Sequence, residues 1–137
     1  MTNEQLPESV LALLRDHVTS FEQLEVLLLL QAHPHDHWTA ATAGERTRMP
    51  VDLVESALAG LAGGGLVEQV RENPPAYCFA PRDNRSRQAA ADLAVAYRDR
   101  HALVMSTLSM NAIERIRSGT LRAFSDAFLL RRKDEDG

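Results

Sequence analysis

The sequence holds only one cysteine, Cys78, and no long apolar run. With a single thiol no disulfide can form within the chain, which fits a reducing compartment, so we expect a cytoplasmic protein. The longest uninterrupted apolar run covers residues 26–30, far short of the roughly 18 residues that a membrane span needs. The polar, acidic N-terminus does not have the pattern of a secretory signal. We therefore expect neither a disulfide framework nor contact with a membrane.

Aromatic residues are scarce as well, at 5% of the 137 residues, whereas apolar residues reach 45% and charged residues 25%. The last two values are ordinary for a globular protein and argue against wholesale disorder. Helix-forming Ala, Leu, Arg and Glu are abundant, and the length suits one modest core. The composition predicts a mainly α-helical globular protein.

Signatures of catalysis are also lacking. The run Gly63-Gly64-Gly65 follows a helical pattern and has no Lys-Ser/Thr after it, so it is predicted to end a helix and not to bind phosphate. No nucleophile lies in a recognisable elbow. Cys78 stands between Tyr77 and Phe79, which is more typical of a packed strand residue than of a redox sensor. We expect no enzymatic activity and no cofactor.

The charge is divided unevenly along the chain. Residues 1–80 contain four basic and eleven acidic residues, a net charge of −7, and residues 81–137 contain eleven basic and eight acidic residues, a net charge of +3. Together they give the −4 of the whole chain. An acidic part joined to a mildly basic part favours contact between the two, within one chain or across a dimer.

Apolar periodicity and turn residues predict the elements of the first part. A helix begins at Pro7, and a second begins at Ser20, where S-x-x-Q forms a capping box. The second helix is apolar nearly all round and is expected in the centre of the fold or in a subunit interface. Further helices are predicted from Thr39 to about residue 47 and from Pro50 to the glycine run. Alternation then predicts strands over residues 66–70 and 76–79, joined by a turn.

This order of elements resembles the bacterial winged helix-turn-helix regulators over about residues 21–81. The residues that carry the resemblance are Trp38-Thr39 before the first motif helix, residues 53–61 in the place of a recognition helix, and GGGLVE before the wing. The flanking helices are similar to the dimerising helices of MarR- or PadR-type proteins. The resemblance implies a mainly α fold: a winged helix-turn-helix with a two-stranded wing in residues 1–81, and a helical extension in residues 82–137 for dimerisation or docking.

The resemblance also implies a function in transcription regulation. A homodimer would bind DNA, with residues 52–61 as the recognition helix and Arg46, Arg48 and Arg71 on phosphates. The start of that helix departs from the pattern of DNA readers, however, because the exposed positions there carry an apolar residue, two acids and a serine. These residues are Val51, Asp52, Glu55 and Ser56.

Carboxylates at Asp52 and Glu55 would repel the phosphates of DNA. The alternative function is a protein–protein interaction adaptor, in which the acidic helix face binds a basic partner or the C-terminal helices. Both functions stay open at this point.

Two features lie outside the motif. A long helix is predicted from Ser86 or earlier to about Met110 and continues to residue 128, with a break or kink at Gly119. The run HPHDHW places His33, His35 and His37 near an aspartate, which is a sufficient set of ligands for zinc, and histidine also titrates near neutrality. No second cluster of ligands supports a metal, so we interpret the run as a hinge that ends the second helix at residue 34.

Overall fold

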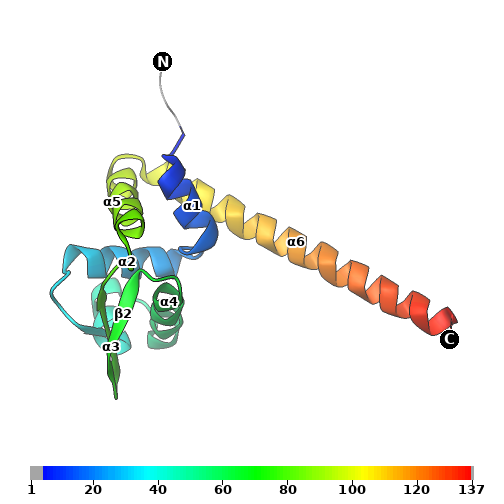
Figure 1. Cartoon of the computed structure of the whole chain (residues 1–137), viewed down its shortest axis with the longest axis horizontal. Coiled ribbons are helices and arrows are strands. Elements are labelled where there is room, and N and C mark those ends of the chain that lie inside the picture. The colour runs from blue at the N-terminus through cyan, green and yellow to red at the C-terminus, as the bar shows by residue number, and fades with distance from the viewer. Residues whose placement is uncertain (1–4, 137) are drawn as a thin grey trace.

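The computed structural model of the chain describes residues 5–136, with only the backbone described for residue 126 and residues 128–136. Figure 1 shows a body of short helices and a small sheet, from which one long helix projects. Over the described residues the fold is mainly helical, as the composition predicts. In chain order, the elements are α1 (Glu8–Asp16), α2 (Phe21–Ala32), β1 (Trp38–Thr39), α3 (Ala40–Thr47), α4 (Val51–Gly63), β2 (Val67–Glu72), β3 (Pro75–Phe79), α5 (Asn84–Asp99) and α6 (His101–Asp136).

The predicted N-terminal cap of α2 is present, but the Gln23 side chain bonds to a different backbone N–H than a capping box requires. The Ser20 hydroxyl accepts a hydrogen bond from the Gln23 N–H at 3.1 Å, which satisfies one of the free donors of the first turn. The Gln23 side chain reaches one residue further back than a capping box requires, because its Oε1 accepts from the Thr19 N–H at 2.7 Å. Both bonds fix the point at which the chain enters α2.

The three strands form one antiparallel sheet in the order β1-β3-β2. The predicted hairpin of β2 and β3 is present, and Trp38 of β1 pairs with Tyr77 of β3 on its other side. A bulge between Gln69 and Arg71 interrupts the register of β2. The tip of the hairpin lies at the end of the body opposite α5 (Figure 1).

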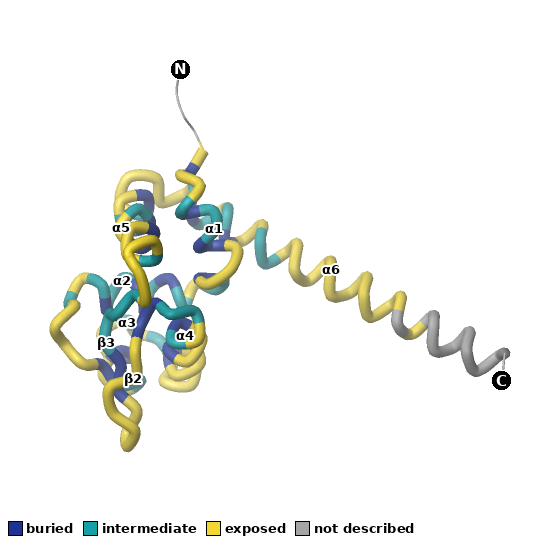
Figure 2. Tube along the Cα trace, viewed as in Figure 1, coloured by how far each residue is buried: buried dark blue, intermediate teal, exposed yellow. Residues whose placement is uncertain are grey.

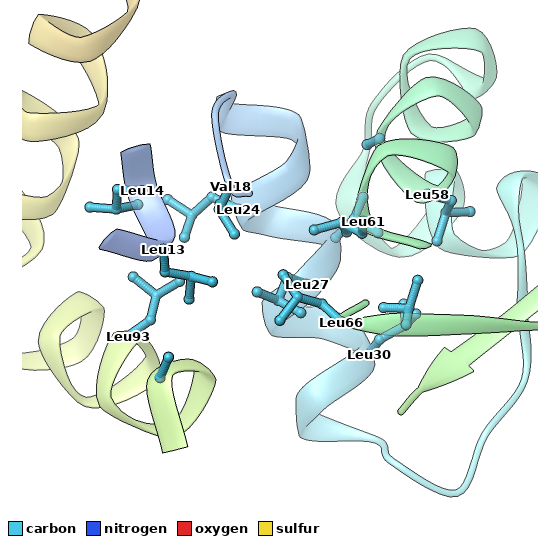
Figure 3. Packing of buried hydrophobic residues seen from close by; sticks show 14 of the residues in the cluster. Leu13, Leu14, Val18, Leu24, Leu27, Leu30, Leu58, Leu61, Leu66 and Leu93 are labelled. Atoms are coloured by element: carbon cyan, nitrogen blue, oxygen red, sulfur yellow. The ribbon is translucent and has the colours of Figure 1, made fainter. Parts of the chain in front are cut away.

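The core is one cluster of aliphatic side chains with α2 at its centre (Figure 3). Leu27 and Leu30 of α2 lie between α1 and α5 on one side and α4 and the sheet on the other. The apolar character of α2 all round follows from this position, since it buries more than one face. The cluster joins residues 8–79 to the first helix of the C-terminal extension. Its largest fully buried side chains are Leu14, Leu24, Leu27, Leu30, Leu58, Leu61, Leu66 and Leu93.

The C-terminal helices differ from the prediction. The break falls at Arg100, not at Gly119: Arg100 has φ −137° and ψ 51°, which ends α5, and α6 then runs through Gly119 without interruption. Leu93 of α5 and Val104 of α6, on either side of the turn, are both buried in the core. The Arg100 guanidinium holds the turn by donating to the Gln5 carbonyl at 3.0 Å.

Beyond the first turns, α6 leaves the body. Side chains from Ile113 to Ser125 are all exposed, as Figure 2 shows along the projecting part of the helix. Despite its length, α6 is not apolar enough to cross a membrane, and the same holds for every other helix in residues 5–136.

Candidate functional site

The turn between α3 and α4 positions the residues for which sequence analysis predicts partner contact. Helix α3 begins with a complete capping box, in which the Thr39 hydroxyl accepts from the Thr42 N–H at 3.1 Å and the Thr42 hydroxyl accepts from the Thr39 N–H at 2.9 Å. It ends at Arg48, whose φ of 58° and ψ of 41° are left-handed. Gly44 permits the close turn, because a Cβ there would lie 3.1 Å from the Met49 carbonyl oxygen.

The first two turns of α4 form an exposed surface that we call the α4 surface. Val54, Leu58 and Leu61 point into the core and fix the orientation of the helix. The residues of the α4 surface are exposed and include no basic residue and no amide: Val51, Asp52, Leu53, Glu55 and Ser56.

The chemistry of the α4 surface combines acid with apolar area. Val51 is 49% exposed and Leu53 is 42% exposed, so the surface offers apolar area beside its carboxylates. Asp52 lies in the first turn, where the partial positive charge of the helix N-terminus stabilises a carboxylate. The surface can therefore form apolar contacts and accept hydrogen bonds from cationic groups.

The three arginines that are predicted to contact phosphates have different surroundings. The Arg46 guanidinium carbon lies 5.6 Å from the centre of the Trp38 ring, and its Nη2 lies 3.5 Å from His33 Nε2. This cation–π contact holds Arg46 against the junction of α2 and β1. Arg48 is exposed at the α3–α4 turn, next to the α4 surface, and Arg71 is exposed on the hairpin at the bulge of β2.

The histidine run joins α2 to β1. His33 is half-buried, with its ring 5.8 Å from that of Trp38, whereas His35 and His37 are exposed. Among the residues described here, no group of three or more His, Cys, Asp or Glu side chains is placed to hold a metal ion. Trp38 is buried and anchors the end of the run.

A polar contact that no sequence pattern predicts links the helical extension to α2. The Tyr97 hydroxyl donates to Glu25 Oε1 at 2.8 Å across 72 residues of sequence, and the Tyr97 ring lies 4.5 Å from that of His101. Burial of the phenol and its hydrogen bond to the Glu25 carboxylate raise the pKa of Tyr97 to about 12. No local pattern reveals this pair, because each residue alone is an ordinary partly exposed side chain.

A cleft of about 730 Å³ lies where α1, Gly64 and the start of α5 meet. Its lining has charges of both signs: Glu8, Asp16 and Asp83 against Arg15, Arg82 and Arg85. Three of these groups are already engaged, since Arg15 pairs with Asp16 at 3.3 Å and Asp83 caps α5. The mixed lining does not select a class of ligand, so the α4 surface is the stronger candidate.

Comparison with protein-family models, with curated proteins and with solved structures finds no match to this chain. A functional assignment therefore depends on the arrangement of its own residues.

Proposed function

We propose that residues 21–81 form a winged helix-turn-helix that acts in transcription regulation by binding a protein, and not DNA, through the α4 surface. The order α2, β1, α3, α4, β2, β3 and the sheet order β1-β3-β2 support the architecture. The choice of a protein over DNA as the partner is based on the α4 surface. This surface has two carboxylates and two exposed aliphatic side chains but no basic residue.

Electrostatics disfavours DNA at this surface. Affinity for DNA comes largely from neutralising phosphates with Lys and Arg. A carboxylate about 7 Å from a phosphate is repelled by about 0.6 kcal/mol even at the dielectric constant of water, and each further phosphate adds to this. Asp52 and Glu55 lie one turn apart on the exposed side of α4, so both would face the polyanion together. Arg46 lies over the Trp38 ring and is not part of the α4 surface.

The same residues suit a protein surface. Protein interfaces use desolvated apolar anchors surrounded by polar groups. Val51 and Leu53 lie two residues apart, at the two edges of the exposed face of α4, with Asp52 and Glu55 between them. The aliphatic side chains supply the anchors, and the carboxylates would accept hydrogen bonds from Arg or Lys of the partner. The expected partner therefore carries basic residues flanked by apolar side chains.

DNA binding is the second candidate function. It is favoured by Arg48, which lies exposed beside the α4 surface, and by Arg71 on the projecting hairpin. In that arrangement both arginines contact phosphates and Ser56 approaches the groove.

The two functions are separated by titrating the chain against labelled duplex DNA, both mixed sequence and the DNA upstream of its own gene. Anisotropy is measured at salt concentrations from about 50 to about 200 mM. We expect no saturable binding by the wild type, and a gain of binding in Asp52→Arg/Glu55→Arg. Saturable binding that weakens steeply with salt and is lost in Arg48→Ala would show that the chain reads DNA.

The protein arm uses a partner recovered by cross-linking to the wild-type chain and then purified. Leu53→Ser is expected to weaken its affinity about tenfold, because it removes one of the two apolar anchors of the surface. Val95→Ser is the matched control, because Val95 is 48% exposed but lies on α5, away from α4. Equal effects of the two substitutions would contradict binding through the α4 surface.

A further inference from the structure

Large apolar side chains follow one another along the part of α6 that leaves the body, which Figure 2 colours as exposed. They are between 57% and 71% exposed, more than any other large apolar side chain described in the body. We call this set the α6 stripe: Met110, Ile113, Ile116, Leu121 and Phe124.

The α6 stripe faces away from the body of its own chain. At about 100° per residue, its members fall within an arc of about 140°, the width of face that an amphipathic helix usually buries. Val104 and Leu108 are buried against the body, and the Asn111 side chain donates to the Leu14 carbonyl at 3.4 Å. These three point about 180° away from the centre of the stripe.

Helices in proteins owe most of their stability to the packing of an apolar face, because propensity alone leaves an isolated helix marginal. Within the described residues, nothing covers the α6 stripe from Ile113 onward. Gly119 further lowers the intrinsic helicity of this part relative to alanine. The length and exposure of α6 therefore indicate a partner for the stripe.

The spacing of the stripe indicates which partner. From Ile113 the steps to Ile116, Leu121 and Phe124 are three, five and three residues, a pattern that is the same in both directions. A two-fold interface requires such self-complementarity, since each residue contacts the symmetry-related position. A two-fold axis that passes between residues 118 and 119 makes the two helices antiparallel. Ile113 then lies opposite Phe124 of a second copy, and Ile116 lies opposite Leu121 of that copy.

We propose that the α6 stripe pairs with that of a second copy of this chain as two antiparallel helices. Arg117 and Thr120 also lie within the arc and oppose each other across the axis. The aliphatic stem of arginine covers apolar area while its guanidinium reaches water, so Arg117 is compatible with this position.

The proposed pairing places the two bodies on opposite sides of the pair of helices. Each body lies on the outer side of its own helix, because the stripe faces the other way. The outermost contact described between α6 and the body is the hydrogen bond that Arg115 Nη1 donates to the Thr19 carbonyl at 3.4 Å. Its two copies lie about 7 residues or roughly 10 Å apart along the common axis.

The contact area predicts a moderate affinity. Each exposed side chain of the stripe contributes on the order of 100 Å², so two copies bury about 1,000 Å², the lower limit of a specific interface. We therefore expect dissociation in the micromolar range and a dimer population that depends on concentration.

Sedimentation of the full chain between about 1 and about 200 µM tests the association, a range that brackets the micromolar dissociation expected from this area. In Ile116→Glu/Leu121→Glu, four carboxylates enter the apolar contact of each pair, so association is expected to weaken at least about 100-fold. The matched control is Ser118→Glu/Gly119→Glu, which adds the same charge off the stripe, at positions that are exposed. A monomer at all concentrations, or equal weakening by both variants, overturns the proposal. So does a monomer that binds anionic phospholipid vesicles through the stripe.

Disulfide cross-linking tests the direction of the helices. In a Cys78→Ser background, Ile116→Cys and Leu121→Cys are oxidised separately and as a mixture. We expect cross-linking in the mixture alone, because two copies of residue 116 are offset by about 7.5 Å along the axis in addition to the distance between the helices. That separation exceeds the roughly 7 Å limit between Cα atoms of a disulfide. Efficient cross-linking of either variant alone indicates a parallel pair and refutes the proposal.

These variants leave the α4 surface unchanged. Failure of the pairing therefore has no bearing on the partner proposed for α4, and the reverse also holds.

Discussion

The hydrogen bond from Tyr97 to Glu25 gives the sharpest prediction about stability, because it joins the helical extension to the central helix at one defined point. Tyr97→Phe removes only the hydroxyl, and the 2.8 Å bond to the carboxylate is lost. Hydrogen bonds to charged groups contribute about 1.5–3 kcal/mol, and we take the lower end because both side chains are only half-buried. The variant is therefore expected to lose about 1.5 kcal/mol of unfolding free energy, or about 5 °C in Tm.

The contribution of Tyr97 also depends on pH in a predictable direction. In the folded chain the pKa of its phenol is raised from 10.0 to about 12. The unfolded chain thus releases the proton first, and stability that is fully present below pH 10 is lost as the pH rises towards 12. The difference between the wild type and Tyr97→Phe should shrink over that window.

Two measurements check the reasoning about Tyr97. Chemical denaturation at neutral pH gives the loss of stability, with a cycle through Glu25→Gln to isolate the pair. Absorbance of the phenolate in Tyr77→Phe, which leaves Tyr97 as the single tyrosine, gives its pKa directly. An ordinary pKa near 10 together with an unchanged unfolding free energy in Tyr97→Phe would refute the account of this contact.

Three further predictions concern the backbone and core. Leu27→Ala empties a fully buried position in α2 and is expected to cost about 3–4 kcal/mol in chemical denaturation; a cost below about 1 kcal/mol would contradict its central place. Arg48→Gly relieves a left-handed φ of 58° and should raise the unfolding free energy by about 0.5–1 kcal/mol, whereas a loss would show that the side chain stabilises the turn. Gly119→Ala, at a position where a Cβ meets nothing within 4 Å, should increase helicity by circular dichroism and stability by up to about 1 kcal/mol; an unchanged spectrum would argue against a continuous α6.

Local sequence signals predict the elements of residues 20–80 well, because each is specified by neighbours in the chain. The Ser20 and Thr39 caps, the stripe of α4 and the alternation of the hairpin all depend on residues fewer than about ten positions apart. The break at Arg100 does not follow from such signals, since the helical pattern continues on both sides of it. It depends on tertiary contacts such as the hydrogen bond from the Arg100 guanidinium to the Gln5 carbonyl, 95 residues away in sequence.

The candidate site was only partly predictable for the same reason. The acidic character of Asp52 and Glu55 is evident from the sequence once α4 is placed. Arg46 lies over Trp38, whereas Arg48 ends α3 at the turn to α4. The position of Arg46 depends on how α3 packs beside β1. The sequence likewise does not predict that the α6 stripe is exposed, because an apolar periodicity does not distinguish a buried face from an exposed one.

The stack at the start of α3 gives the chain a built-in optical probe. Trp38 is the only indole in the sequence, it is 7% exposed, and Arg46 and His33 both lie against it. Tryptophan fluorescence therefore reports on a single junction, between α2, β1 and α3. A bound molecule that draws Arg46 off the ring will change the emission, so engagement of this end of the body can be followed in unlabelled protein.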